Sequence, residues 1–153
     1  MSATPVLIRD IEPRDEADWR RLFSDYGVFY DTAFSAQVLD GVWAWLLDPA
    51  QGVDAVVAEQ DGAVVGFAHY RRLADTFTAG PGWFLDDLFV SPGHRGSGAA
   101  TALIGAVAAR ASQRGGGTLR WITAADNARA QRVYDRLAVR TTWVTYELET
   151  GQV

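Results

Sequence analysis

The sequence predicts a mixed α/β domain (α/β, α+β) in which helices cover both faces of a central sheet. Residues 53–73 contain two β-rich segments joined by Asp61-Gly62, a pair typical of the tight turns of antiparallel hairpins. After this hairpin, segments with strand character alternate with segments of helical periodicity. An antiparallel group followed by strands joined through helices favours a mixed sheet with helices on its faces.

The first half of the chain predicts three secondary-structure elements before the hairpin. A strand is expected over residues 6–12, followed by a helix over 13–26 that begins with a proline and an acidic first turn. A second helix is expected over residues 35–48, with Ser35 as its N-cap and its end before Pro49.

The second half of the chain predicts the remaining strands and helices. A strand over residues 84–90 precedes a helix that begins after Gly98 and ends at the three glycines 115–117, where a left-handed cap forms easily. The apolar residues of this helix recur at the spacing of one helical face; they are Ala100, Leu103, Ile104, Val107, Ala108 and Ala111. The last elements expected are a strand over 118–124, a helix over 127–137 capped by Asp126 or Asn127, and a closing strand over 141–149.

Composition narrows the class of protein. A chain of 153 residues with 48% hydrophobic residues is expected to form one domain, residues 1–153, with a packed core. It contains no cysteine, which excludes disulfides, thiolate metal sites and a cysteine nucleophile. Its net charge is −5, and the sequence contains no long run of basic residues, which disfavours binding to nucleic acid or to an anionic membrane surface. The first residues do not resemble a signal peptide, so we expect a cytoplasmic protein. We also expect no metal, with which the lack of cysteine agrees.

A glycine-containing turn links the strand at 84–90 to the following helix. Backbone N–H groups at a helix start lack intrahelical partners, and together with the helix dipole they form an anion site. Gly96 and Gly98 let a phosphate approach the backbone because they carry no Cβ, while Arg95 and His94 add side-chain donors. The turn therefore predicts phosphate or pyrophosphate binding, unless it is simply a tight connection between strand and helix.

Other phosphate-binding loops fit this turn less well. A Walker A loop requires Gly-Lys followed by Ser or Thr, and no lysine lies near residues 91–101. A dinucleotide fingerprint requires a third glycine and an opening βαβ unit, whereas this turn follows an antiparallel group. The common nucleotide-binding classes are thus disfavoured.

The strand at 84–90 carries two adjacent carboxylates, Asp86 and Asp87. Strict alternation along a strand places them on opposite faces of the sheet, so they are not expected to form a catalytic pair. Burial of a carboxylate is costly unless it is paired, and Arg71 or Arg72 on the neighbouring strand are candidate partners. His69 on that strand is a second candidate base.

The turn and the last helix together resemble the GNAT superfamily of N-acetyltransferases. Residues 95–100, Arg-Gly-Ser-Gly-Ala-Ala, fit the pattern Arg/Gln-x-x-Gly-x-Gly/Ala of its acetyl-CoA pyrophosphate loop, and residues 127–134 fit its second motif, Asn-x-x-Ala-x-x-x-Tyr. The order of elements from about residue 6 to 149 is also similar, with the histone and polyamine acetyltransferase-like branch as the nearest pattern. The resemblance implies a mostly antiparallel GNAT-like sheet. It also implies binding of acetyl-CoA, the donor substrate, by Leu88, Phe89, Val90, His94, Arg95, Gly96, Ser97, Gly98, Ala99, Ala100, Asn127 and Tyr134.

The resemblance further implies roles in catalysis. Asp86 would either take the proton of the incoming ammonium, directly or through water, or anchor the acceptor as a substrate-binding residue. The Leu88 N–H would polarise the thioester carbonyl where the strand splays from its neighbour. Tyr134 would protonate the leaving thiolate, and Asn127 would contact the pantetheine arm. One departure is Leu137-Ala138, where the family usually has Leu-Gly, which puts the local turn in doubt.

The acceptor and the assembly are less defined. By resemblance, the connection between the first two helices lines the acceptor site, where Tyr26, Phe29, Tyr30 and Asp31 suit a cationic amine. These residues are equally compatible with simple packing on the core. We therefore expect an N-acetyltransferase acting on a polyamine, an amino acid or a peptide amine, with a non-catalytic acyl-CoA-binding module as the alternative. The aromatic closing segment suggests a homodimer.

Overall fold

A computed structural model describes residues 4–151 of the chain. The chain divides into two compact units, residues 1–122 and residues 123–153, and each is described here by itself. Among the described residues, no helix has the length and apolarity needed to cross a membrane.

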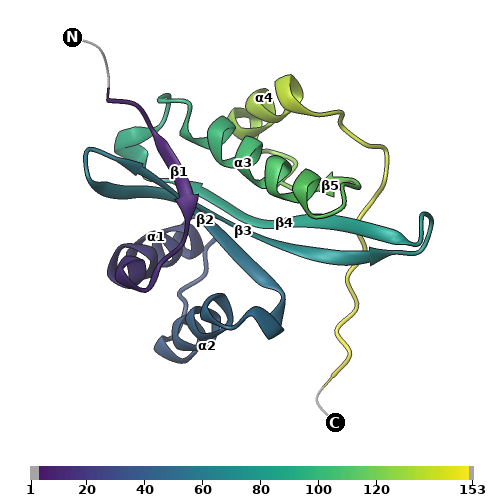
Figure 1. The fold of residues 1–153 in the computed structure, drawn as a ribbon, viewed down its shortest axis with the longest axis horizontal. Coiled ribbons are helices and arrows are strands. Elements are labelled where there is room, and N and C mark those ends of the chain that lie inside the picture. Colours follow the sequence, from purple (N-terminus) through teal and green to yellow (C-terminus); the bar gives the residue numbers. More distant parts are fainter. Residues whose placement is uncertain (1–3, 152–153) are drawn as a thin grey trace. The chain divides into compact units, whose positions relative to one another are not determined.

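The first unit is built on a five-stranded sheet (Figure 1). Its strands follow one another in space in the order of the chain. They are β1 (Leu7–Asp10), β2 (Val53–Gln60), β3 (Ala63–Asp75), β4 (Gly80–Val90) and β5 (Leu119–Arg120). The first four pair antiparallel, and β5 pairs parallel with β4. The predicted mixed and mostly antiparallel sheet is therefore confirmed.

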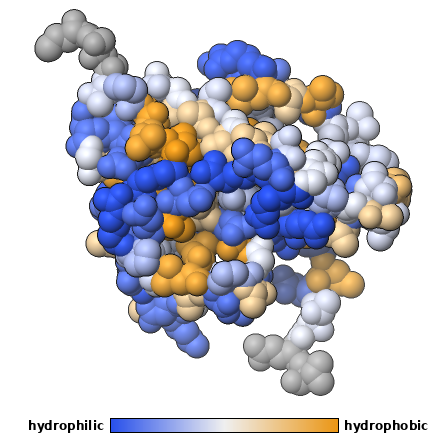
Figure 2. All heavy atoms as spheres, in the orientation of Figure 1, coloured by the Kyte–Doolittle hydropathy of each residue, from blue (hydrophilic) through white to orange (hydrophobic). Residues whose placement is uncertain are grey.

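Helices cover both faces of this sheet, as expected. Helices α1 (Glu16–Phe29) and α2 (Ala36–Leu47) lie on one face, and α3 (Ala99–Gln113) lies on the other (Figure 1). The core on the α1 and α2 face is largely aromatic; it comprises Trp19, Leu22, Phe23, Trp43, Val57, Val64, Phe67 and Phe89. On the other face α3 buries Leu103, Ile104, Val107 and Ala111 of the predicted apolar stripe. Ala100 is half-buried, and Ala108 is exposed. In the view of Figure 2, apolar side chains form small patches between hydrophilic ones.

The predicted caps and turns are largely confirmed. The hydroxyl oxygen of Ser35 accepts a hydrogen bond from the Val38 N–H at 3.2 Å, which caps α2. Asp61 and Gly62 both have positive φ, 53° and 76°, as a tight hairpin turn between β2 and β3 requires. The glycines at 115–117 follow the end of α3, and all three have positive φ.

The second unit contains helix α4 (Ala128–Leu137), which agrees with the predicted helix. The expected closing strand over residues 141–149 is not formed, and this prediction was wrong. Residues 138–151 have no regular secondary structure, because no described strand pairs with them. The predicted strand over 118–124 is also shorter than expected, since β5 contains two residues.

Candidate active site

A glycine loop connects β4 to α3. A single 3-10 turn (Pro92–His94) follows β4, and the loop then passes through Gly96 and Gly98, whose φ angles are 83° and 84°. Both conformations lie in the left-handed region that glycine adopts without steric cost. The loop adopts this shape because glycine occupies both positions that require a positive φ.

The first turn of α3 has no side-chain cap. Gly98 is its N-cap and has no side chain that could accept a hydrogen bond from the following N–H groups. A Cβ placed on Gly96 or on Gly98 would meet no atom within 4 Å, so the space beside both residues is open. The sequence from 91 to 101 contains no acidic residue. The loop therefore presents unpaired donors and the positive end of a helix dipole to open space.

Two side chains of the loop are held in place. The Arg95 Nε donates to the Val90 carbonyl at 3.3 Å, and its guanidinium lies over the rings of Phe89 and Phe29 at 5.6 and 5.9 Å. The Ser97 hydroxyl donates to the His94 carbonyl at 2.6 Å. These contacts fix the loop backbone and leave the terminal nitrogens of Arg95 for a ligand.

The edge of β4 that faces β5 is open beyond Phe84. The pairing with β5 comprises Trp83 and Phe84, and no described strand covers this edge from residue 85 to 90. The Ser91 N–H donates to the Val65 carbonyl of β3 at 2.8 Å. Successive residues of a strand direct their N–H and C=O groups toward opposite edges. Since the N–H of Ser91 faces β3, the backbone groups of Val90 and Leu88 face the open edge. The N–H and C=O of Leu88 and the N–H of Val90 are thus open to a chain that lies along β4, whereas the Val90 carbonyl accepts from Arg95.

A β-bulge lies in the middle of β4. His69 of β3 pairs with Asp87 and Tyr70 pairs with Leu85, so Asp86 is an extra residue in the ladder. The predicted alternation of the two carboxylates was therefore wrong. Asp86 binds Arg71 and Asp87 binds His69, and these two partners are two residues apart on one face of β3. Both carboxylates consequently lie on the face covered by α1 and α2.

The two carboxylates have different partners. Both oxygens of Asp86 lie near the Arg71 Nε, at 3.1 and 3.0 Å. Burial raises the pKa of Asp86, a shift that Asp87 reinforces and that Arg71 opposes. Asp87 accepts no hydrogen bond from an arginine among the described residues; its Oδ2 lies 2.9 Å from the Nδ1 of His69. The expected pairing with a neighbouring arginine thus holds for Asp86 alone.

His69 is fully enclosed behind Asp87. Its Nε2 lies 2.9 Å from the indole Nε1 of Trp19 on α1, and 2% of its side chain is exposed. The rings of Phe23 and Phe67 pack against it at 5.0 and 4.7 Å. The sequence singled out His69 but not Trp19, because their contact joins positions 50 residues apart and leaves no local pattern.

The predicted acceptor residues lie at the end of α1. The ring of Tyr26 packs against Tyr30 at 5.0 Å and against Phe89 of β4 at 6.3 Å. Tyr30 is 42% exposed, and Asp31 follows it with a left-handed φ of 57°. Tyr26 therefore joins the acceptor residues to the strand that carries the carboxylates, while Asp31 lies at the exposed end.

The second unit holds the other predicted motif. The side-chain Oδ1 of Asn127 accepts from the Ala130 N–H at 3.2 Å and caps α4, which confirms Asn127 as the cap. Tyr134 follows seven residues later, about two helical turns, on the same side of the helix. Ala138 ends the helix with φ −148°, an extended conformation open to any residue. The missing glycine at 138 therefore causes no strain in this turn.

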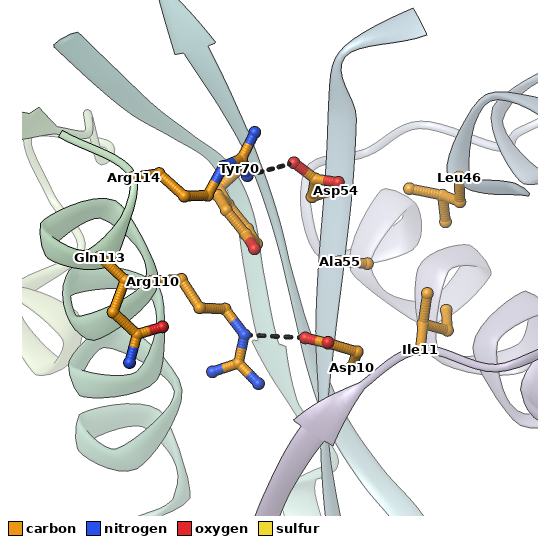
Figure 3. Close-up of a pocket in the computed structure, with 9 residues that line it drawn as sticks. All are labelled: Asp10, Ile11, Leu46, Asp54, Ala55, Tyr70, Arg110, Gln113 and Arg114. Carbon is orange, nitrogen blue, oxygen red and sulfur yellow. Dashed lines mark hydrogen bonds and ion pairs between the residues drawn. The ribbon is translucent and has the colours of Figure 1, made fainter. Parts of the chain in front are cut away.

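A polar cavity of about 490 Å³ lies elsewhere in the first unit (Figure 3). Its charged side chains are already paired, Arg110 with Asp10 at 2.7 Å and Arg114 with Asp54 at 3.0 Å. It lies at the C-terminal end of α3, roughly 18 Å along the helix from Gly98 at 1.5 Å per residue. This cavity is therefore separate from the glycine loop.

The glycine loop, the open edge and the carboxylates are together typical of an α/β protein with an anion-binding loop beside an acidic pair. Residues 15–138 match the acetyltransferase (GNAT) family. The D-amino-acid N-acetyltransferase HPA3 of Saccharomyces cerevisiae is 30% identical over 93% of this chain and 89% of its own length. The ribosomal-protein-alanine N-acetyltransferase of Brucella melitensis biovar Abortus 2308 is 25% identical, with a TM-score of 0.79 over 96% of this chain and 100% of its own. The aminoglycoside N-acetyltransferase AAC(6')-Iy in complex with CoA shares the fold, with a TM-score of 0.84, 22% identity and coverage of 98% of both chains.

The chain belongs to the GNAT acetyltransferase family. It is an acetyl-CoA-dependent N-acetyltransferase.

Proposed function

We propose that residues 1–153 act as one domain that transfers the acetyl group of acetyl-CoA to a primary amine by direct attack. The observation that carries this proposal is the continuity of the open β4 edge with the uncapped glycine loop. A pyrophosphate bound at residues 95–100 leaves the pantetheine arm to run along residues 88–90. In this arrangement the pyrophosphate of acetyl-CoA meets the N–H groups of the loop, and the pantetheine arm meets the backbone of β4.

The Leu88 N–H is proposed to polarise the thioester carbonyl. It faces the open edge, and negative charge develops on the carbonyl oxygen as the amine attacks. His94 lies at the rim of the same loop, where its Nδ1 is buried and has no hydrogen-bond partner among the described residues. A bound pyrophosphate would supply such a partner.

Asp86 is proposed to take the proton that the acceptor ammonium must lose before it attacks. A protonated amine has no free lone pair, so a nearby base is required. The raised pKa of Asp86, caused first by burial, brings this carboxylate closer to the range in which proton transfer is efficient.

Tyr134 is proposed to protonate the leaving thiolate, and Asn127 to contact the pantetheine arm. Support comes from the motif over residues 127–134 and from the match to the family, which extends to residue 138. Replacement Tyr134→Phe should lower kcat about 100-fold or more, the usual contribution of a general acid. Affinity for CoA should stay the same, as measured by calorimetry.

The matched control for this test is Tyr146→Phe, because Tyr146 lies in the same unit and is 91% exposed. It should leave kcat unchanged. Full activity of the Tyr134→Phe protein would refute the assignment of the general acid. Tight CoA binding by a wild-type chain that acetylates no amine would instead favour the alternative, a non-catalytic acyl-CoA-binding module.

The acceptor is proposed to be a small cationic amine. Asp86, Asp87 and Asp31 supply negative charge on or beside the α1 face, and Tyr26 and Tyr30 supply aromatic surface. Related proteins act on D-amino acids and aminoglycosides, according to their names. Initial rates with a polyamine, free L- and D-amino acids, an aminoglycoside and a basic peptide will rank these acceptors.

We also propose a homodimer. In the second unit the apolar side chains between residues 139 and 148 are 74–91% exposed, which is unusual for a chain that stays monomeric. Analytical ultracentrifugation of the wild type and of Trp143→Ser tests this expectation. A monomeric wild type would refute it.

A further inference from the structure

We propose that Trp19 and His69 are positioning residues that hold Asp87 as the anchor for the acceptor ammonium. This inference rests on the proposed function and extends it. Asp86 keeps its proposed role as the group that takes the proton, whereas Asp87 binds the cationic acceptor before transfer. The geometry behind the proposal is a hydrogen-bonded line from Trp19 through His69 to Asp87.

The direction of this line follows from the chemistry of tryptophan. An indole N–H donates a hydrogen bond and cannot accept one. The Nε2 of His69, 2.9 Å from the Trp19 Nε1, must therefore be the acceptor and carries no proton. The remaining proton of the neutral ring is on Nδ1, which donates to the Asp87 Oδ2 at 2.9 Å. Trp19 thus selects one tautomer of His69.

The surroundings of His69 keep it in this state. A second proton on Nε2 would break the hydrogen bond from Trp19 and place a cation between the rings of Phe23 and Phe67. The charged groups near the imidazole are Asp87 and Asp86 on β4, with Arg71 on β3 beside Asp86. Helix α1 contributes apolar rings and the indole N–H. His69 therefore orients Asp87 and does not serve as the base.

Asp86 and Asp87 differ in the partners that neutralise them. Asp86 is compensated by Arg71, which contacts both of its oxygens. Asp87 receives a hydrogen bond on Oδ2 from the His69 ring, and no described arginine binds it. Its side chain is 24% exposed. Of the two carboxylates, Asp87 is the one without an arginine partner, which favours it as the acceptor of a hydrogen bond from an ammonium.

The test combines a spectroscopic and a kinetic measurement on the full chain. The chain has two histidines, His69 and His94, so the ¹⁵N signals of histidine-labelled protein can be assigned with His94→Gln. We expect His69 to show a protonated Nδ1 and an unprotonated Nε2. In Trp19→Phe the aromatic volume stays but the donor is lost, and this preference should weaken.

The kinetic arm measures KM for the best acceptor separately from kcat. Trp19→Phe should raise the acceptor KM about 3–10-fold, the value of one lost hydrogen bond, with a smaller change in kcat and an unchanged Kd for CoA. Asp87→Asn should raise the acceptor KM at least as much. The control is Trp45→Phe, since Trp45 lies on α2 and is 47% exposed; it should change none of these values.

Each outcome decides between the claims. A His69 with a protonated Nε2, or an imidazolium, in the active wild type overturns the positioning role without any variant, even if Trp19→Phe fails to fold. An unchanged acceptor KM in Trp19→Phe overturns it as well. A wild type that binds acetyl-CoA and shows the expected tautomer but acetylates no amine overturns the proposed function and the anchoring role of Asp87 with it.

Discussion

The conformation of Gly98 offers a direct test of the glycine loop. Gly98 has a φ of 84° and caps α3, whereas Gly93, five residues earlier, has an ordinary negative φ. A Cβ at either position meets no atom within 4 Å. Gly98→Ala and Gly93→Ala therefore add the same methyl group to open space, and they differ in backbone strain alone.

The expected size of the effect follows from that strain. A residue with a Cβ pays about 1–2 kcal/mol in the left-handed region. If the loop keeps its shape, the cost lowers the free energy of unfolding; if the loop relaxes, its donors turn from the pyrophosphate and CoA binds less tightly. In the second case the same free energy corresponds to a loss of roughly 5–30-fold in affinity.

Chemical denaturation and calorimetry of CoA binding measure the two contributions on the same proteins. Gly98→Ala should lose stability, affinity or both, whereas Gly93→Ala should stay close to wild type. If the two variants match each other in both measurements, the assignment of the loop conformation as the basis of pyrophosphate binding is refuted.

Two further predictions concern carboxylates with opposite pKa shifts. Burial is the largest single influence on Asp15 and would raise its pKa. The hydrogen bonds from Arg9 and from the Glu12 N–H, together with the charges of Arg9 and Arg14, outweigh burial and hold the pKa below its usual value. Asp15 therefore stabilises the fold above about pH 4, and this contribution is lost as pH falls through its folded pKa. Asp15→Ala should therefore cost about 3–5 kcal/mol at pH 7, as for a broken buried ion pair, whereas Asp40→Ala at an exposed pair should cost less than about 1 kcal/mol in urea unfolding. The pKa of Asp86 is raised, so its contribution is present below about pH 4 and is lost as pH rises through its folded pKa; Asp86→Asn should be at least as stable as wild type at pH 7 while it loses activity. A marked loss of stability in Asp86→Asn, measured in the same unfolding series, would contradict this sign.

Local signals in the sequence predicted most of the fold. The hairpin at Asp61-Gly62, the cap at Ser35 and the apolar periodicity of α3 depend on neighbours within a few positions, and each was confirmed. The closing strand failed because β-rich composition alone does not form a strand; a strand requires a partner, and no described strand pairs with residues 141–149.

The candidate site was predictable to a more limited degree. The glycine loop could be located because its residue types determine its backbone conformations. The arrangement of the carboxylates could not, since a bulge leaves no distinct composition and Asp-Asp fits a regular strand equally well. The contact of Trp19 with His69 depends on how α1 lies on the sheet, which is set by packing of the whole core.

The bulge at Asp86 has a consequence for how such a site changes in evolution. In a regular strand without a bulge, one of two consecutive aspartates would point into the apolar layer beneath α3. With it, the ladder continues undisturbed on either side, from Leu85 to Tyr70 and from Asp87 to His69. A single-residue insertion or deletion at this position therefore adds or removes one polar group at the acceptor face while both hydrophobic layers keep their packing. If the proposed acceptor face is right, we expect substrate preference to shift through the length of one strand, without any exchange of core residues.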